Sequence, residues 1–236
     1  MARGSNIVTH HLRGNLGDLT FVDSRRYGPH VRSRRGSIKP ARLNEAMAKS
    51  ARRMAQANIP AKTIFDAVRG WHKDGELWNK LVVLFRKQLR EGRACSVDAL
   101  AGLECHEVFT LDQLISATSC QFGHRQEGDR LLVDWSAATH LDWSHLERKY
   151  DFAYRLSLIA LFPDLKKGVY HREVVHGPVT GFKTPPQPIR FEVPVPDDAT
   201  DYVLFLLASV YEGDEVPAQS RIKGMGVMGT GKAWEG

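Results

Sequence analysis

Six short segments with the composition of β-strands follow one another after residue 100, and they limit the folds open to this chain. Each segment alternates apolar and polar side chains or is apolar almost throughout, which is typical of strands with one or both faces buried. Parallel strands need crossover connections of about a dozen residues or more, usually a helix, so this spacing predicts antiparallel sheets and argues against a parallel α/β sheet. The segments are residues 102–111, 129–136, 152–162, 169–175, 188–195 and 201–211.

Two aromatic residues within these segments favour a β-sandwich. Trp135 lies near the end of an early strand and is expected to fill the space between two sheets. Tyr202 stands at the start of the most apolar strand, where a tyrosine corner is expected. The order of the segments resembles a fibronectin type III or immunoglobulin-like domain over residues 107–230, with about seven strands.

The residues before this region have helical periodicity. After a linker over residues 36–39, Pro40 suits the first turn of a helix, and apolar residues then recur at helical spacing. Pro60 is predicted to open a second helix, and Gly92 is predicted to close a third. We therefore expect three helices, over residues 40–58, 60–70 and 76–91.

Residues 14–36 carry the clearest local signal for a β-hairpin. The apolar points Leu16, Leu19, Phe21 and Val31 belong to short runs on both sides of a separator, residues 23–29, that is rich in residues favouring turns. Gly14 and Gly17 bracket a tight turn in which a positive φ is expected.

These patterns predict an α+β chain, in which an N-terminal β-hairpin and helices precede an antiparallel fibronectin III/Ig-like β-sandwich. The glycine-rich end, residues 225–236, is expected to be a flexible tail or a final strand ordered by pairing. The predicted parts are a basic β-hairpin arm with a three-helix region (1–92), a connector (93–106), the sandwich (107–230) and a flexible tail (231–236).

The spacing GNLGDLTFVDSRRYGPHVRSRRGSIKPA, followed by an alanine-rich helix and a C-terminal sandwich, resembles a family of uncharacterised bacterial proteins. Their N-termini combine a glycine, a short strand, a polar turn, a return strand of V-R-S type, a proline and an alanine-rich helix. This sequence departs from the pattern because its first helix has no glutamine-rich start. The family has no assigned activity, so the resemblance implies a layout and no function.

Positive charge is concentrated at the N-terminal end. The first 60 residues contain twelve Lys and Arg and three Asp and Glu, a net charge of +9. The whole chain carries +6, so the remaining residues carry −3. A basic segment on a slightly acidic body indicates an anionic partner. Three partners fit: nucleic acid, an acidic protein surface, or the acidic body of a neighbouring copy. The alternative is a solvated basic face that maintains solubility.

The candidate binding residues lie in and after the hairpin. Arginine and lysine bind phosphate or carboxylate groups, while Tyr27 and His30 can stack on bases. Arg32 and Arg34 alternate, so they line one face of a strand. The full set is Arg25, Arg26, Tyr27, His30, Arg32, Arg34, Arg35, Lys39 and Arg42.

Motifs for catalysis or metal binding are not found in the sequence. The segment GMGVMGTGK lacks the Ser or Thr that follows the lysine of a phosphate-binding loop, since Ala233 follows Lys232. His140, Asp142 and His145 come closest to a ligand cluster, but no further ligand accompanies them at metal-binding spacing, so we interpret them as polar loop residues. The three cysteines fit no zinc or redox pattern and are expected to be small buried side chains.

The sequence therefore favours a non-enzymatic structural or interaction protein without cofactor or metal. It is expected to assemble with other copies or other subunits through the basic arm and the sandwich edges. The alternative is a nucleic-acid-binding protein that uses the arginine-rich hairpin. No apolar run is long enough to span a bilayer, so we expect the chain in the cytoplasm or in a particle assembled there.

Overall fold

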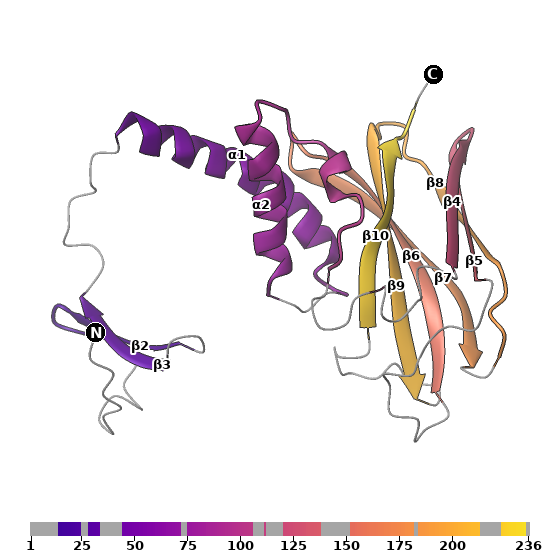
Figure 1. The fold of residues 1–236 in the computed structure, drawn as a ribbon, viewed down its shortest axis with the longest axis horizontal. Helices are drawn as coiled ribbons and strands as arrows, with labels where there is room; N and C mark the ends of the chain where they lie inside the picture. Colours follow the sequence, from indigo (N-terminus) through magenta and orange to yellow (C-terminus); the bar gives the residue numbers. More distant parts are fainter. Residues whose placement is uncertain are drawn as a thin grey trace. The chain divides into compact units, whose positions relative to one another are not determined.

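Figure 1 shows the computed structural model of the chain. It describes residues 14–24, 28–33, 44–71, 75–105, 111, 120–137, 152–181, 184–212 and 223–234. Within them the protein has two α-helices and antiparallel sheets, so the α+β prediction is confirmed at this level. The chain divides into two compact units, Met1–Ala48 and Lys49–Gly236. The predicted boundaries at residues 92, 106 and 230 stay predictions.

The N-terminal unit contains a small antiparallel sheet. Strand β2 (Leu19–Ser24) pairs with β3 (Gly28–Ser33), which confirms the predicted hairpin. A further strand, β1 (Gly14–Leu16), pairs with the other side of β2 and was not predicted. Gly17, in the turn between β1 and β2, has a φ of +57°, as expected for a tight turn that favours glycine. The segment SNIVTHHL, residues 5–12, has the pattern of a short strand leading into the hairpin, but it lies outside the described residues.

The described residues form fewer α-helices than the sequence indicates, and the first helix is longer than predicted. Helix α1 (Glu45–Val68) begins after Asn44, whose Oδ1 accepts a hydrogen bond of 2.8 Å from the Met47 amide, and α2 spans Leu77–Arg90. The prediction that Pro60 opens a second helix is wrong, because α1 continues through this residue. An interior proline costs about 3 kcal/mol. Pro60 and the adjacent Ala61 are both buried, and this packing offsets the cost.

Two further antiparallel sheets belong to the second unit. Most of their strands coincide with predicted segments, whereas β4 was not predicted. The segment predicted as a strand over residues 102–111 contributes an isolated bridge, Glu104 with Gly226, and residues 106–110 lie outside the described part. The strands are β4 (Cys120–Glu127), β5 (Arg130–Ala137) and β8 (Ile189–Pro194) in one sheet, and β7 (Val169–Gly181), β6 (Phe152–Asp164), β9 (Asp201–Glu212) and β10 (Lys223–Lys232) in the other.

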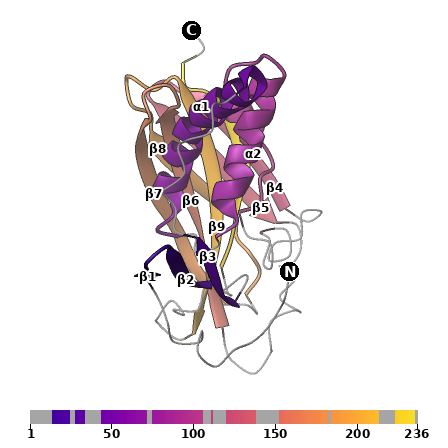
Figure 2. The same ribbon diagram turned by 90° about the vertical axis from the view of Figure 1, so that its left-hand side faces the viewer.

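The four-stranded sheet is buried on both faces. On one face, Leu156 and Leu158 of β6 share a core with Trp135 of the three-stranded sheet, so Trp135 packs between the sheets as predicted. On the other face, Ile159 and Leu161 share a core with α1, α2 and the short helix η2 (Val97–Leu100). Figure 2 shows both α-helices lying over this second face. The glycine-rich C-terminal segment forms β10 by pairing with β9, which is the predicted final strand.

Substitutions on the two faces of β6 test this layered arrangement. Leu158→Ala and Ile159→Ala each remove a fully buried side chain, so each is expected to lower the free energy of unfolding by about 2 to 5 kcal/mol. The matched control is Val83→Ala on α2, where the side chain is 65% exposed and a change within about 0.5 kcal/mol is expected. Urea denaturation followed by circular dichroism measures the three values. Equal effects of Ile159→Ala and Val83→Ala would contradict burial beneath the helices.

Candidate interaction surface

The polar face of the N-terminal sheet brings two predicted binding residues together. Pairing places Thr20 opposite Arg32 and also opposite Asn15, and the Thr20 hydroxyl donates a hydrogen bond of 2.7 Å to Asn15 Oδ1. His30 stands two residues before Arg32, opposite Val22, and therefore shares this face. Arg32 is exposed and His30 is half-buried. An exposed guanidinium beside an imidazole can bind a phosphate or a carboxylate.

The opposite face of the same sheet is apolar. Leu16 pairs with Leu19, and Phe21 pairs with Val31. Leu16 is 71% exposed, Leu19 46% and Val31 40%. Sequence reasoning noted these apolar positions without assigning them to a binding surface. The signal that could have found them is their alternation with Thr20 and Arg32, which places them together on the face away from the charge.

The remaining members of the predicted set cannot be placed on this sheet. Arg25, Arg26, Tyr27, Arg34, Arg35, Lys39 and Arg42 lie outside the described residues. The predicted binding set is therefore represented by His30 and Arg32 alone.

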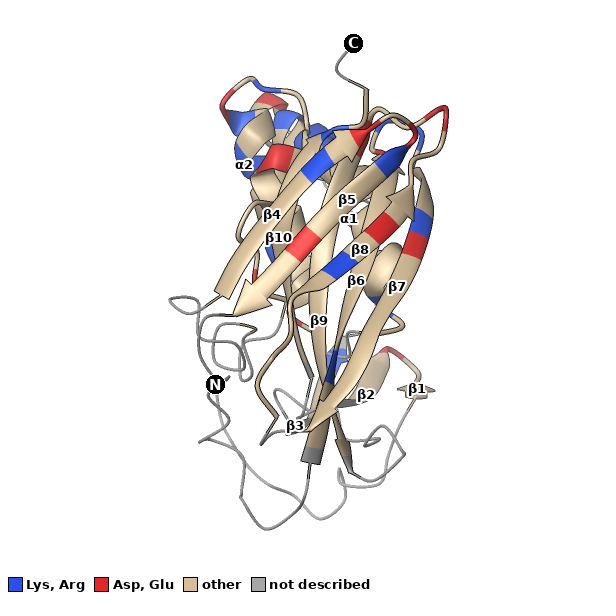
Figure 3. Cartoon of the chain, turned by 90° about the vertical axis from the view of Figure 1, so that its right-hand side faces the viewer, with Lys and Arg blue, Asp and Glu red and all other residues tan. Residues whose placement is uncertain are grey.

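A network of ion pairs covers the outer face of the sheet formed by β4, β5 and β8 (Figure 3). Asp134 accepts hydrogen bonds of 2.7 Å from Arg190 Nε and 2.9 Å from Arg125 Nη1. The pKa of Asp134 is held below its usual value chiefly by the hydrogen bond from Arg190. Desolvation opposes this effect, and the hydrogen bond from Arg125 lowers the pKa further by a smaller amount. Arg130 pairs with Glu192 at 2.9 Å. Exposed pairs of this kind contribute little to stability, and their main effect is to keep this face polar.

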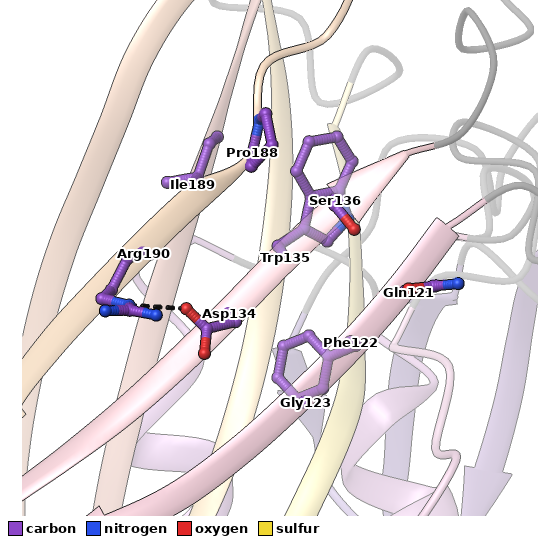
Figure 4. A pocket seen from close by; sticks show the side chains of 9 residues that line it. All are labelled: Gln121, Phe122, Gly123, Asp134, Trp135, Ser136, Pro188, Ile189 and Arg190. Atoms are coloured by element: carbon purple, nitrogen blue, oxygen red, sulfur yellow. Dashed lines mark hydrogen bonds and ion pairs between the residues drawn. The ribbon is translucent and has the colours of Figure 1, made fainter.

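A pocket of 620 Å³ opens at one end of this sheet, beside Asp134 and Arg190 (Figure 4). Its apolar wall is formed by Phe122, Trp135 and Ile189, which pair across the three strands. Trp135 is 2% exposed, and its buried Nε1 has no hydrogen-bond partner among the residues that the structure describes. Asp134 and Arg190 bond to each other, so their charges are already matched. The other lining residues are Gln121, Gly123, Ser136 and Pro188.

The histidines and cysteines do not converge on a reactive centre in the described part of the chain. His124 packs edge-to-face on Tyr202, with ring centroids 5.6 Å apart, and burial lowers its pKa. Cys105 is buried as predicted, whereas Cys95 and Cys120 are half-buried; all three are free thiols. Burial raises the pKa of the Cys95 thiol, which makes it less reactive.

The described ranges contain neither a cluster of metal ligands nor a helix that could span a membrane. No group of three or more His, Cys, Asp or Glu side chains there could hold a metal ion. His140, Asp142 and His145 lie outside these ranges. No helix among the described residues has the length and apolar character needed to cross a bilayer.

Comparison of the chain with protein-family models gave no match, and comparison with curated proteins gave none either.

The Asp134 network predicts a measurable change in acid titration. Removing the main hydrogen-bond donor with Arg190→Gln should raise the pKa of Asp134 toward 3.8, because the folded-state carboxylate loses its strongest partner. In the wild-type protein the pKa of Asp134 is lower in the folded state than its usual value of 3.8. The ionised carboxylate therefore stabilises the folded state above pH 3.8, and this stabilisation is lost as the pH falls through the lower folded-state pKa. Carbon-detected NMR of the Asp134 carboxyl group measures this shift. Arg130→Gln is the control and should leave the Asp134 pKa unchanged; equal pKa values in both variants would contradict the assignment.

Proposed function

We propose that this chain is a non-enzymatic structural or interaction protein that assembles with other copies of itself. The observation that carries the proposal is the exposure of Leu16, Leu19 and Val31 on one face of a small sheet. Removing exposed apolar side chains from water by contact with a partner is favourable, and burying each such side chain contributes about 1.5 to 3 kcal/mol. Contact with a second copy would cover this face.

Charge supports a second copy as the occupant. The first 60 residues carry +9 and the rest of the chain −3, so the basic end of one molecule is attracted to the remainder of another. Arg32 lies on the face opposite the apolar one. It can therefore bind carboxylates of one neighbour while the apolar face binds another.

The sheet edges also favour contact through the N-terminal unit. In the second unit, the β10 edge is partly covered, since Cys105 N donates to Met225 O and Val227 N donates to Leu103 O, both at 2.9 Å. The β7 edge contains Pro178 and an irregular register beside it, features that discourage strand addition. We propose the edges β1 and β3 as the main sites of strand pairing between copies.

We propose that the body that carries this arm is a fibronectin type III-like sandwich located in the cytoplasm, or in a particle assembled there. If β4 to β10 are lettered A to G, the sheets read A-B-E and D-C-F-G. In an immunoglobulin constant domain the sheets are ABED and CFG, so the difference is the transfer of strand D to the other sheet. This order supports the prediction made from the strand pattern.

Nucleic-acid binding is the second candidate function. It is favoured by the placement of exposed Arg32 and neighbouring His30 on one polar face, and by the excess of Lys and Arg in the first 60 residues. Phosphate contacts from such a surface would be independent of sequence and sensitive to salt.

Removing the exposed apolar side chains tests assembly. Light scattering coupled to size-exclusion chromatography should give the wild-type assembly a mass of at least two monomers of 26.5 kDa each. The triple variant Leu16→Ser, Leu19→Ser, Val31→Ser should shift to the monomer mass, because it lacks the apolar contact. The matched control is Val169→Ser, Val179→Ser on β7, which removes side chains exposed at 56% and 55% and should leave the mass unchanged. A wild-type monomer at about 100 μM, where contacts of micromolar affinity are saturated, would rule the proposal out.

A salt titration separates the second candidate. If the polar face binds nucleic acid, affinity for a single-stranded oligonucleotide should fall steeply between 50 and 200 mM salt, by about a factor of 10³ or more for six or more phosphate contacts. Arg32→Gln should lower the salt slope by about one, whereas Arg130→Gln, on the second unit, should not. Fluorescence anisotropy measures both. No binding at the lowest salt, or equal slopes in both variants, would count against this function.

A further inference from the structure

A polar patch interrupts the helix-side face of the four-stranded sheet. Along β6 this face carries Leu161 and Ile159 and then changes to Ser157 and Arg155. Along β9 it carries Leu207 and then changes to Ser209 and Tyr211. The change in polarity therefore occurs on both neighbouring strands, at Ser157 on β6 and one position further along, opposite Arg155, at Ser209 on β9.

Strand register brings these polar residues close to one another. Arg155 stands directly opposite Ser209, and Ser157 stands opposite His176 of β7. The Ser157 hydroxyl and His176 Nδ1 are hydrogen-bonded at 2.8 Å. The guanidinium carbon of Arg155 lies 5.0 Å from the centre of the Tyr211 ring. Residues from three strands thus form one cluster.

Three of the five residues of this polar cluster are buried, whereas Arg155 is half-buried and His176 is exposed. Ser157 is 2% exposed, Ser209 6% and Tyr211 5%. Among the described residues, Arg155 Nε and the Tyr211 hydroxyl are both buried and have no hydrogen-bond partner. Across the described ranges, no ion pair joins Arg155 to a carboxylate. The positive charge of Arg155 also lowers the pKa of His176, as a smaller contribution after burial.

Unsatisfied buried donors of this kind require an acceptor. Leaving a buried donor without a partner costs about 1 to 3 kcal/mol, and more for a charged group. A water molecule or an ion is one of the explanations for such groups in native proteins, besides strain and a catalytic role. Water can accept a hydrogen bond but cannot neutralise a guanidinium, whereas an oxyanion does both.

We propose that Arg155 and Tyr211, together with Ser157, Ser209 and His176, form a binding site for a small oxyanion, which is a phosphate or a carboxylate group. Arg155 supplies the charge and Nε–H, Tyr211 donates its hydroxyl hydrogen, and the two serines offer further hydroxyl groups. All five residues belong to the second unit, Lys49–Gly236, and the proposal does not depend on the assembly proposed above.

Thermal unfolding with inorganic phosphate and with acetate, each at constant ionic strength set by sodium chloride, tests the site. At about ten times the dissociation constant, the better of the two anions should raise Tm by about 3 to 6 °C, with saturation. Saturation by phosphate alone would assign a phosphate ligand, and saturation by acetate alone would assign a carboxylate ligand. Tyr211→Phe removes one hydroxyl and should weaken binding about ten- to a hundredfold. Arg155→Gln should abolish the saturable shift, whereas the control Arg130→Gln should retain it.

The wild-type protein provides a second measurement that needs no variant. A bound anion beside His176 should raise the pKa of its imidazole, because the anion stabilises the charged form. Proton NMR of the histidine ring during a pH titration, with and without the saturating anion, measures the change. Absence of a saturable Tm shift with both anions, a shift of equal size in Arg155→Gln, or an unchanged His176 pKa would each overturn the proposal.

Discussion

The pairing of β6 with β9 is the interaction on which the rest of Lys49–Gly236 depends. Leu158 stands opposite Leu206, and both belong to the core shared with the three-stranded sheet. One position further, Ile159 stands opposite Phe205, and both belong to the core shared with the helices. Because side chains alternate along a strand, the same strand pair supports two cores. The helices and the three-stranded sheet are therefore each held to the central sheet.

Arg172 on the edge strand β7 fixes the end of α1 to this sheet. Its Nη1 donates a hydrogen bond of 2.7 Å to the Ala67 carbonyl, and its guanidinium carbon lies 4.5 Å from the centre of the Trp71 ring. The last carbonyls of a helix have no partner within the helix and carry partial negative charge. The Arg172 guanidinium donates a hydrogen bond to one of these carbonyls and its positive charge compensates their partial negative charge. The position of α1 is therefore determined by a polar contact as well as by apolar packing.

Local sequence pattern predicted the elements whose burial is regular, and failed where partners override local preference. β5, β6, β8 and β9 alternate or are apolar throughout, and Trp135 was placed correctly between the sheets. β4 was missed because CQFGHRQE has few apolar residues, and its pairing with β5 defines it as a strand. The helix break expected at Pro60 is absent because burial against the sheet outweighs the missing hydrogen bond.

For the candidate sites too, features that depend on local sequence could be predicted, whereas features that depend on strand pairing could not. An arginine-rich segment is a property of composition, so the basic N-terminus could be recognised without a structure. The apolar face of its sheet requires knowledge of which residues pair, and the oxyanion cluster requires the register of three strands, since Arg155, His176 and Tyr211 are distant in the sequence. In an apolar segment such as residues 152–162, a single arginine is expected to face solvent. In the described part of the chain Arg155 Nε is instead buried and has no hydrogen-bond partner, a feature that depends on strand register and that no local motif predicts.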